Sequence, residues 1–297
     1  MDNFSQQKKT TLELISRSSK IIVIPSSPVD GDALGSALAL HLILEKMGKQ
    51  SVVNYSFNRF SSFKFLPAVD QIQINDLFKL DLSTYNLAIF VDGGNLRQFY
   101  DQKIHPEVMK LPDSLTTLNI DHHLTNEKFA KHLVWELKTS STCEIIYRLF
   151  SDQLPLNKEI ATNLYVGILT DTGRFKYSNT SSQALKIASE LLSFDVDVGF
   201  ISLNLDDTIP LAVLQFIGKL IPLMQVNLEF KYSYLMLPLT GWQGKVSLEE
   251  MKQATSIVRD DFLKKIPGVD FAVLCKEEDS GYIDVSLRTR VSNSINL

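Results

Sequence analysis

Residues 21–48, IIVIPSSPVDGDALGSALALHLILEKMG, form the pattern that decides the fold: a strand, an acidic turn and a helix. The β-branched run Ile21–Ile24 predicts a buried strand. Proline, serine, aspartate and glycine then form a turn, and an apolar helix is expected from Ala33 to about Gly48. A strand that leads through a short loop into a helix is the unit from which α/β domains with parallel sheets are built.

The same pattern recurs further along the chain. Apolar strands are expected at Leu87–Val91 and Leu115–Ile120, and they lead directly into Asp92 and Asp121. A later helical stretch ends with Asp171. In open α/β sheets, ligands collect at the carboxyl ends of the strands, so these acidic residues are expected on one rim of the sheet.

The pattern changes after residue 192. Residues 1–192 fit one α/β domain with a largely parallel sheet, whereas residues 193–212 show no clear periodicity and are expected to form a linker. Residues 213–297 combine strand-like and helical stretches, which predicts a second, smaller α+β domain.

The composition is that of an ordinary globular protein and restricts the function. The 297 residues are 44% apolar and 22% charged, and the net charge of −4 argues against a long basic surface for nucleic acid. Cys143 and Cys275 are far apart, which fits a reduced cytosolic protein better than a disulfide scaffold. The N-terminus lacks the apolar core of a signal peptide, and no apolar run approaches the ~18 residues needed to span a bilayer. The sequence therefore predicts a cytoplasmic protein without membrane contact.

Asp30-Gly31-Asp32 is the first candidate for chemistry. Two carboxylates one residue apart on a tight loop can ligate two neighbouring cations, and Mg²⁺ and Mn²⁺ prefer such oxygen ligands. The same residue types are common in turns and at helix N-caps, and the motif taken alone favours that structural interpretation.

Asp121-His122-His123 is a stronger candidate, because two of only five histidines lie beside a carboxylate at a strand end. Adjacent histidines point in different directions, so one can bind a metal while the other faces a substrate. Asp92 fits the role of a carboxylate that bridges two ions, but it also fits an ordinary turn. Asp171 fits the role of a metal ligand, but it also fits a polar residue at the end of a helix. Converging carboxylates repel one another unless cations compensate, so convergence of these segments would favour a metal site.

Six short segments share the order and spacing of a known family. They are Val29–Ser36, Val91–Gly94, Ile120–Asn126, Ser141–Glu144, Gly167–Gly173 and Phe175–Thr180. Together they resemble the DHH phosphoesterase superfamily, and within it the two-domain proteins that degrade very short oligonucleotides and dephosphorylate 3′-phosphoadenosine 5′-phosphate. The resemblance covers almost the whole chain. It implies a DHH domain joined by a linker to a DHHA1-type domain, with the active site in the cleft between them.

The resemblance also implies the ligands of two Mn²⁺ ions, with Mg²⁺ as an alternative metal. The first ion would be held by Asp32, Asp92, His122 and Asp171. The second would be held by Asp30, Asp92 and a histidine four residues before Asp30. His123 would face the substrate phosphate, and the reaction would be two-metal hydrolysis with Asp92 and His123 as its catalytic residues.

The sequence departs from the family pattern at both ends. The residue four positions before Asp30 is Ser26, and Val29 replaces the usual proline. A serine hydroxyl is a poor substitute for imidazole, so the Asp30 site should bind metal more weakly. Arg288 is expected to contact phosphate from a strand of the second domain, but the Gly-Gly-Gly-His segment that normally follows is absent, and the sequence ends at Leu297. These features fit either a naturally short protein or a fragment.

The function expected first is the hydrolysis of short oligoribonucleotides or 3′-phosphoadenosine 5′-phosphate. Ser26 and the missing glycine-rich segment leave a second hypothesis open, a degenerate family member that binds nucleotide or one metal with weak or no catalysis. Cyclic-dinucleotide hydrolysis is a third. The expected partners are small nucleotide substrates, and a homodimer is left open.

Overall fold

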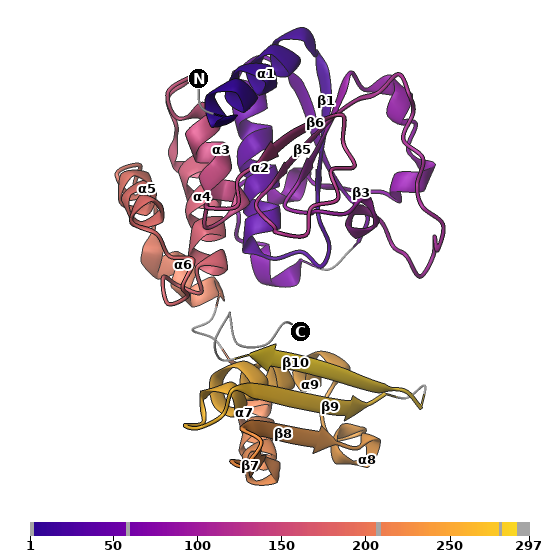
Figure 1. Ribbon diagram of the computed structural model, residues 1–297, viewed down its shortest axis with the longest axis vertical. Coiled ribbons are helices and arrows are strands. Elements are labelled where there is room, and N and C mark those ends of the chain that lie inside the picture. The colour runs from indigo at the N-terminus through magenta and orange to yellow at the C-terminus, as the bar shows by residue number, and fades with distance from the viewer. Residues whose placement is uncertain (1–2, 58–59, 206–208, 279–280, 290–297) are drawn as a thin grey trace. The chain divides into compact units, whose positions relative to one another are not determined.

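The computed structural model describes residues 3–57, 60–205, 209–278 and 281–289. The chain folds as two compact units that divide between Leu205 and Asp206. Each unit has its own sheet (Figure 1). Each also has its own buried apolar core. None of the described helices is both long enough and apolar enough to cross a bilayer.

The sheet of the first unit has six parallel strands in the order β3-β2-β1-β4-β5-β6. The strands are β1 (Lys20–Pro25), β2 (Gln50–Tyr55), β3 (Gln73–Ile74), β4 (Leu87–Val91), β5 (Thr116–Asp121) and β6 (His132–Trp135). The strand order reverses at β1, which pairs with β2 on one side and β4 on the other. Such a switch point opens a crevice at the carboxyl ends of the strands. The parallel α/β fold expected from the sequence is confirmed.

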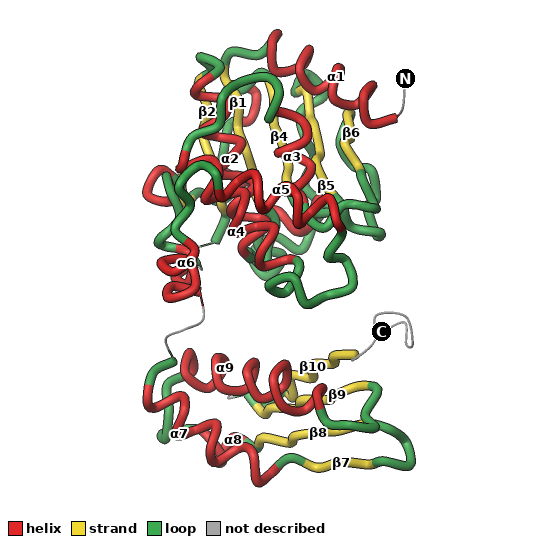
Figure 2. The backbone as a smooth tube through the Cα atoms, turned by 90° about the vertical axis from the view of Figure 1, so that its left-hand side faces the viewer, coloured by secondary structure: helices red, strands yellow, loops and turns green. Residues whose placement is uncertain are grey.

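The two faces of this sheet are covered differently. The helices of the unit are α1 (Asn3–Arg17), α2 (Gly31–Lys46), α3 (Thr142–Phe150), α4 (Lys158–Asp171), α5 (Ser182–Leu192) and α6 (Val198–Leu205). On β1, Ile21 and Val23 pack into the core that these helices share. Figure 2 shows α2, α3 and α4 in front of the strands of the sheet. Ile22 and Ile24 face a second core, which loops and short 3₁₀ turns supply. A strand buried on both faces reads as an unbroken apolar run.

Two glycines let α4 pack closely against α2 and α3. A Cβ atom on Gly35 would lie 2.4 Å from the backbone oxygen of Asn163, and one on Gly167 would lie 2.2 Å from the sulfur of Cys143. Both distances are far below van der Waals contact, so side chains at these positions would force the helices apart. The close crossing brings the end of α4 beside the beginning of α2, where Gly31 lies against Thr170.

The second unit is a smaller α+β unit with a four-stranded sheet in the order β10-β9-β8-β7. Its elements are α7 (Leu211–Leu220), β7 (Gln225–Asn227), β8 (Tyr232–Leu237), α8 (Leu239–Trp242), α9 (Leu248–Ile257), β9 (Phe271–Glu277) and β10 (Ile283–Thr289). Strands β8 and β9 are parallel, and the outer pairs are antiparallel. Apolar side chains of α7 and α9 cover one face of this sheet.

The stretch expected as a linker, residues 193–212, is partly helical. It contains α6, and Ile201 of that helix is fully buried in the core of the first unit. Helix α7 begins at Leu211, and residues 206–208 lie outside the described part of the chain. The sequence of α6 is apolar on all sides, so it carries no helical periodicity from which it could be predicted. Helices α1 and α5 and strands β2 and β6 were also not expected.

Candidate active site

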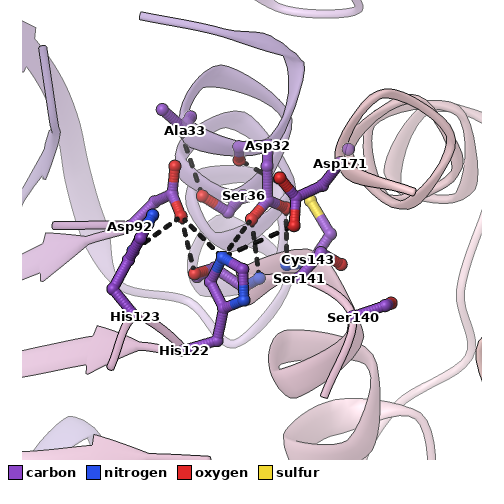
Figure 3. A network of polar contacts seen from close by, with 12 residues as sticks. Asp32, Ala33, Ser36, Asp92, His122, His123, Ser140, Ser141, Cys143 and Asp171 are labelled. Carbon is purple, nitrogen blue, oxygen red and sulfur yellow. Dashed lines mark hydrogen bonds and ion pairs between the residues drawn. The ribbon is translucent and has the colours of Figure 1, made fainter. Parts of the chain in front are cut away.

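The carboxyl ends of β1, β4 and β5 bring the acidic motifs together. Asp92 follows β4, Asp121 ends β5, and both strands lie beside each other in the sheet. The loop after β1 leads to Asp32 in the first turn of α2, and Asp171 is the last residue of α4. Figure 3 shows Asp32, Asp92 and Asp171 around the ring of His122.

His122 lies at the centre of this cluster. Its Nε2 atom is 3.5 Å from Asp92 Oδ1, 3.5 Å from Asp171 Oδ2 and 3.9 Å from Asp32 Oδ2. The Nε2 atom and Asp171 Oδ2 are both buried, and neither has a hydrogen-bond partner among the described residues. Buried polar atoms without partners are costly unless something else satisfies them. One imidazole and three carboxylates are a donor set that suits a hard or borderline divalent cation.

Asp32 is fixed by the N-terminus of α3. Its Oδ2 accepts a hydrogen bond from the backbone of Thr142 at 2.6 Å, and its Oδ1 accepts one from Cys143 at 2.9 Å. The side chain is almost fully buried. The free N–H groups and the dipole of a helix N-terminus stabilise a carboxylate there. The segment Ser141–Glu144, one of the six that carry the family resemblance, therefore both starts α3 and holds a residue of the site.

Asp92 has a backbone φ of +62°, in the left-handed region that few non-glycine residues adopt. Its Oδ1 accepts a hydrogen bond from Thr142 Oγ1 at 3.1 Å. The carboxylate is buried, and burial followed by the nearby charges of Asp32 and Asp30 raises its pKa well above the usual range. A strained backbone and a disfavoured charge persist where the surroundings hold them for a function.

The electrostatics of the cluster disfavour several negative charges at once. Burial, followed by the charge of Asp32, raises the pKa of Asp171 to about 7. The pKa of Asp30 is also raised, first by burial and then by the charge of Asp32, against the effect of its backbone hydrogen bonds. A bound cation reverses this balance because it favours the ionised carboxylates.

His123 lies beside Asp92 and His122 and forms a pair with Asp121. Its Nδ1 is 2.7 Å from Asp121 Oδ1, and this hydrogen bond is the main reason that the pKa of His123 is raised. Burial alone would raise the pKa of Asp121, but hydrogen bonds from His123 and Asn126 outweigh it, so the pKa is lowered. With Nδ1 engaged, the Nε2 atom of His123 is the one left to face a substrate.

Two asparagines that the sequence analysis did not single out tie β4 to β5. Asn119 donates to the backbone oxygens of Phe90 and Gly93 at 3.2 and 3.0 Å. Asn126 donates to Asn119 Oδ1 at 2.7 Å and to Asp121 Oδ2 at 2.6 Å. The network therefore links the Asp92 turn to the histidine pair. A fully buried asparagine inside an apolar strand is the sequence signal that could have indicated it.

The Asp30 carboxylate is the N-cap of helix α2. Its Oδ1 accepts hydrogen bonds from the backbones of Asp32 and Ala33 at 3.0 and 2.9 Å and so caps α2. Asp30 therefore forms the helix N-cap that its residue type favours, and its expected role as a metal ligand stays a prediction. Ser26 is buried beside Gly93. Within the described residues, two groups could hold a metal ion: Asp32, His122 and Asp171, and Asp92, His122 and His123. Neither includes Asp30.

Arg288, the expected phosphate contact, lies on β10 in the second unit. Its Nε atom is 3.6 Å from Asp260 Oδ1, and its guanidinium donates to the backbone oxygen of Leu287 at 2.8 Å. About half of the side chain is exposed, so it can also reach a ligand.

Known proteins are similar to this chain in sequence and in fold. The model of the DHH family, N-terminal domain, matches residues 20–168. A bifunctional oligoribonuclease and PAP phosphatase of Thermus thermophilus is 32% identical over 169 residues, which are 56% of this chain and 48% of the relative. A probable bifunctional oligoribonuclease and PAP phosphatase of Streptococcus mutans is 31% identical over 199 residues, which are 67% of this chain and 60% of the relative. The chain spans about half the length of the curated relatives it matches.

One solved structure matches nearly the whole chain. It is the crystal structure of an exopolyphosphatase-related protein from Bacteroides fragilis, with a TM-score of 0.83 and 24% sequence identity. The match covers 96% of this chain and 83% of that one. At this level of identity the likeness shows a shared fold.

Proposed function

Because the chain belongs to the DHH family, we propose that it is a metal-dependent phosphoesterase that acts on short oligoribonucleotides, on 3′-phosphoadenosine 5′-phosphate, or on both. The two relatives named for these activities are 32% and 31% identical to this chain over 169 and 199 residues. Function depends on the residues of a site rather than on a fold, so the proposal rests on the geometry of the acidic cluster.

One observation carries the proposal. His122 Nε2 and Asp171 Oδ2 are buried, 3.5 Å apart and without hydrogen-bond partners in the described part of the chain. Asp32 and Asp92 complete a set of four donors around this point. A structural ion-pair network would satisfy these atoms directly, whereas a ligand set leaves them open for a cation. The residues present therefore fit a divalent metal.

We assign the first ion to Asp32, Asp92, His122 and Asp171. Mn²⁺ is the proposed metal, because it accepts imidazole as well as carboxylate ligands, with Mg²⁺ as the alternative. When bound, the ion supplies charge neutralisation at the phosphate and a water of lowered pKa. The proposed second ion would use Asp30 and Asp92, and it would bind more weakly because Asp30 caps α2 and Ser26 offers no imidazole.

The protein's own groups are proposed to do the following. Asp121 holds the His123 ring through Nδ1, and this hydrogen bond raises the pKa of His123, which favours the protonated imidazole. The free Nε2–H then donates to a phosphate oxygen, which offsets the negative charge that develops in the reaction. Thr142 and Cys143 keep Asp32 from turning away, since each donates a backbone N–H to it. Arg288 is proposed as a further phosphate contact.

The experiment is turnover by the purified chain in the presence of Mn²⁺. We expect release of mononucleotides from a 5′-phosphorylated triadenylate or of phosphate from 3′-phosphoadenosine 5′-phosphate, and loss of both with EDTA. Absence of metal-stimulated turnover on either substrate would contradict the proposal. His122→Ala should lose activity, and His132→Ala is a matched control, because His132 lies on β6 at the amino end of the strand.

The second candidate is a family member that binds one metal or a nucleotide but turns it over slowly. The use of Asp30 as a helix cap and the presence of Ser26 favour it. Tight binding of one Mn²⁺ ion by calorimetry, together with turnover no faster than that of His122→Ala, would select this candidate over the first.

A further inference from the structure

A cavity of about 220 Å³ lies at the carboxyl ends of β2, β1 and β4, outside the acidic cluster. Ser27 and Pro28 line it from the loop after β1, and Phe57 lines it from the segment after β2. The segment that follows the Asp92 turn contributes Arg97 and Lys103. The volume is large enough for a planar ring with a small group attached, and the lining combines an aromatic face with two cationic side chains.

The cavity adjoins the acidic cluster through shared backbone. Ser27 N–H donates to the carbonyl of Gln98 at 2.7 Å, and Ser26 N–H donates to the carbonyl of Val91 at 3.2 Å. A Cβ atom on Gly93 would lie within 3 Å of both Ser26 and Phe99. The residues beside the Asp92 turn are thus the immediate chain neighbours of those that line the cavity.

The polar and charged side chains that line the cavity differ in how many of their hydrogen-bonding groups have a partner in the protein. The Asp101 carboxylate accepts the backbone N–H of Lys103 at 2.9 Å, and the Tyr100 hydroxyl donates to the carbonyl of Glu107. Arg97 uses one terminal nitrogen on the carbonyl of Pro106 at 2.9 Å, which orients the guanidinium and leaves its other donors. Within the described chain, the Lys103 ammonium has no hydrogen-bond or ion-pair partner.

We propose that this cavity is a second nucleotide subsite, which binds the nucleotide unit next to the one at the acidic cluster. Arg97 and Lys103 would hold its phosphate, and the ring of Phe57 would stack on its base. Guanidinium and ammonium groups bind phosphate, and base–aromatic stacking tolerates any base. The inference rests on the proposed function and deepens it, because only an oligonucleotide has a second nucleotide to place here. A mononucleotide substrate would not need the subsite.

Binding without turnover gives the first test. The probe is fluorescein-labelled triadenylate in EDTA, measured by anisotropy on the full chain. Lys103→Met keeps the length of the side chain and removes its charge, and we expect it to weaken binding about tenfold, as loss of one charged phosphate contact does. Lys110→Met is the matched control, since Lys110 is an exposed lysine on the same segment that does not line the cavity. Equal dissociation constants for Lys103→Met and Lys110→Met would overturn the proposal.

Kinetics give the second test and separate the subsite from the proposed function. With Mn²⁺, Lys103→Met should raise KM for triadenylate about tenfold and leave kcat and the KM for 3′-phosphoadenosine 5′-phosphate within twofold. Phe57→Ala should have the same selectivity, and Phe57→Tyr should restore binding, because it keeps the aromatic face. Equal losses on both substrates would overturn the subsite. If the wild-type chain turned over neither substrate, the proposed function would fail, while the anisotropy result would still decide the subsite.

Discussion

The acidic cluster has two sides that differ in how their carboxylates are held. On one side, Asp32 is buried against two backbone N–H groups of α3, and the Nε2 atom of His122 lies within 3.9 Å of three carboxylates. On the other side, Asp30 is used by the first turn of α2, and Ser26 stands where an imidazole is expected. Asp92 lies between the two sides.

The difference shows that the same residue type serves two purposes within three positions of the sequence. Asp32 lies on α2 but is held by the N-terminus of α3. It therefore keeps a fixed position and still has lone pairs for a ligand. Asp30 accepts the same number of backbone hydrogen bonds, both on Oδ1, and as the cap of its own helix it is oriented by α2. The Asp32 side is therefore expected to bind a cation more tightly than the Asp30 side, and the following experiments test this difference.

The largest effect is expected from Asp92→Ala, because both sides share this carboxylate. A metal ion contributes several kcal/mol to stabilisation of the transition state, so we expect kcat/KM for triadenylate to fall on the order of 10³-fold. Asp92→Asn is the informative companion, because asparagine tolerates the positive φ that alanine resists. If Asp92→Asn kept full activity, the residue would serve the turn and not the metal.

The second-largest effect is expected from a change in packing beside Asp32, which should affect the Asp32 side of the cluster and not the Asp30 side. In Gly167→Ala, the new methyl group would meet Cys143 Sγ at 2.2 Å and Asp32 Oδ1 at 2.8 Å. We expect a loss of about 1–3 kcal/mol in the free energy of unfolding, together with weaker Mn²⁺ binding on the Asp32 side. Urea denaturation and calorimetry measure the two quantities. Gly199→Ala on α6 is the control, since its methyl group would make only an ordinary contact at 3.5 Å. Equal behaviour of the two variants would show that the close packing of α4 against α2 and α3 does not position Asp32.

The third effect is a pH dependence of the metal-free protein. Burial and the charge of Asp32 raise the pKa of Asp171 to about 7, from an ordinary value near 4. Between these values the folded protein holds more protons than the unfolded chain, so stability falls as the pH rises from about 4 to about 7. A pKa unit is worth about 1.4 kcal/mol, and we expect a loss on the order of 2 kcal/mol after allowance for solvent at this partly exposed group. Saturating Mn²⁺ should abolish the loss.

Asp171→Asn tests whether this residue is the cause. The amide does not titrate, so the free energy of unfolding of the variant should vary less over the same pH range, measured in EDTA by urea denaturation. An unchanged slope would assign the effect to other groups, such as Asp92, whose pKa is also raised.

How far the sequence predicts this cluster depends on the kind of signal that each part carries. Strands β1 and β4 carry apolar runs, and β4 and β5 lead directly into Asp92 and Asp121, so their place in a parallel sheet and the shared rim were predictable. The motif Asp121-His122-His123 marked the histidines. Helix α6 was not predictable, because it is apolar on all sides and its burial depends on contacts distant in sequence. The capping role of Asp30 and the link through Asn119 depend on the geometry of loops, which a linear pattern does not record.

The smallest expected effect is a gain in metal affinity on the Asp30 side. It is also the most direct test of the difference between the two sides. Ser26→His offers the Asp30 side the imidazole that it lacks, beside Asp92 and close to Gly93. Loss or gain of one ligand changes the affinity of a weak site on the order of tenfold, which is about 1.4 kcal/mol. We expect calorimetry to show a second Mn²⁺ ion that binds about tenfold more tightly than in the wild type, with the first ion unchanged. Ser27→His is the matched control, since Ser27 faces the neighbouring cavity. If Ser26→His binds the same number of ions with the same affinities, the identity of residue 26 does not limit the Asp30 side, and the capping of α2 by Asp30 is left as the cause of the difference.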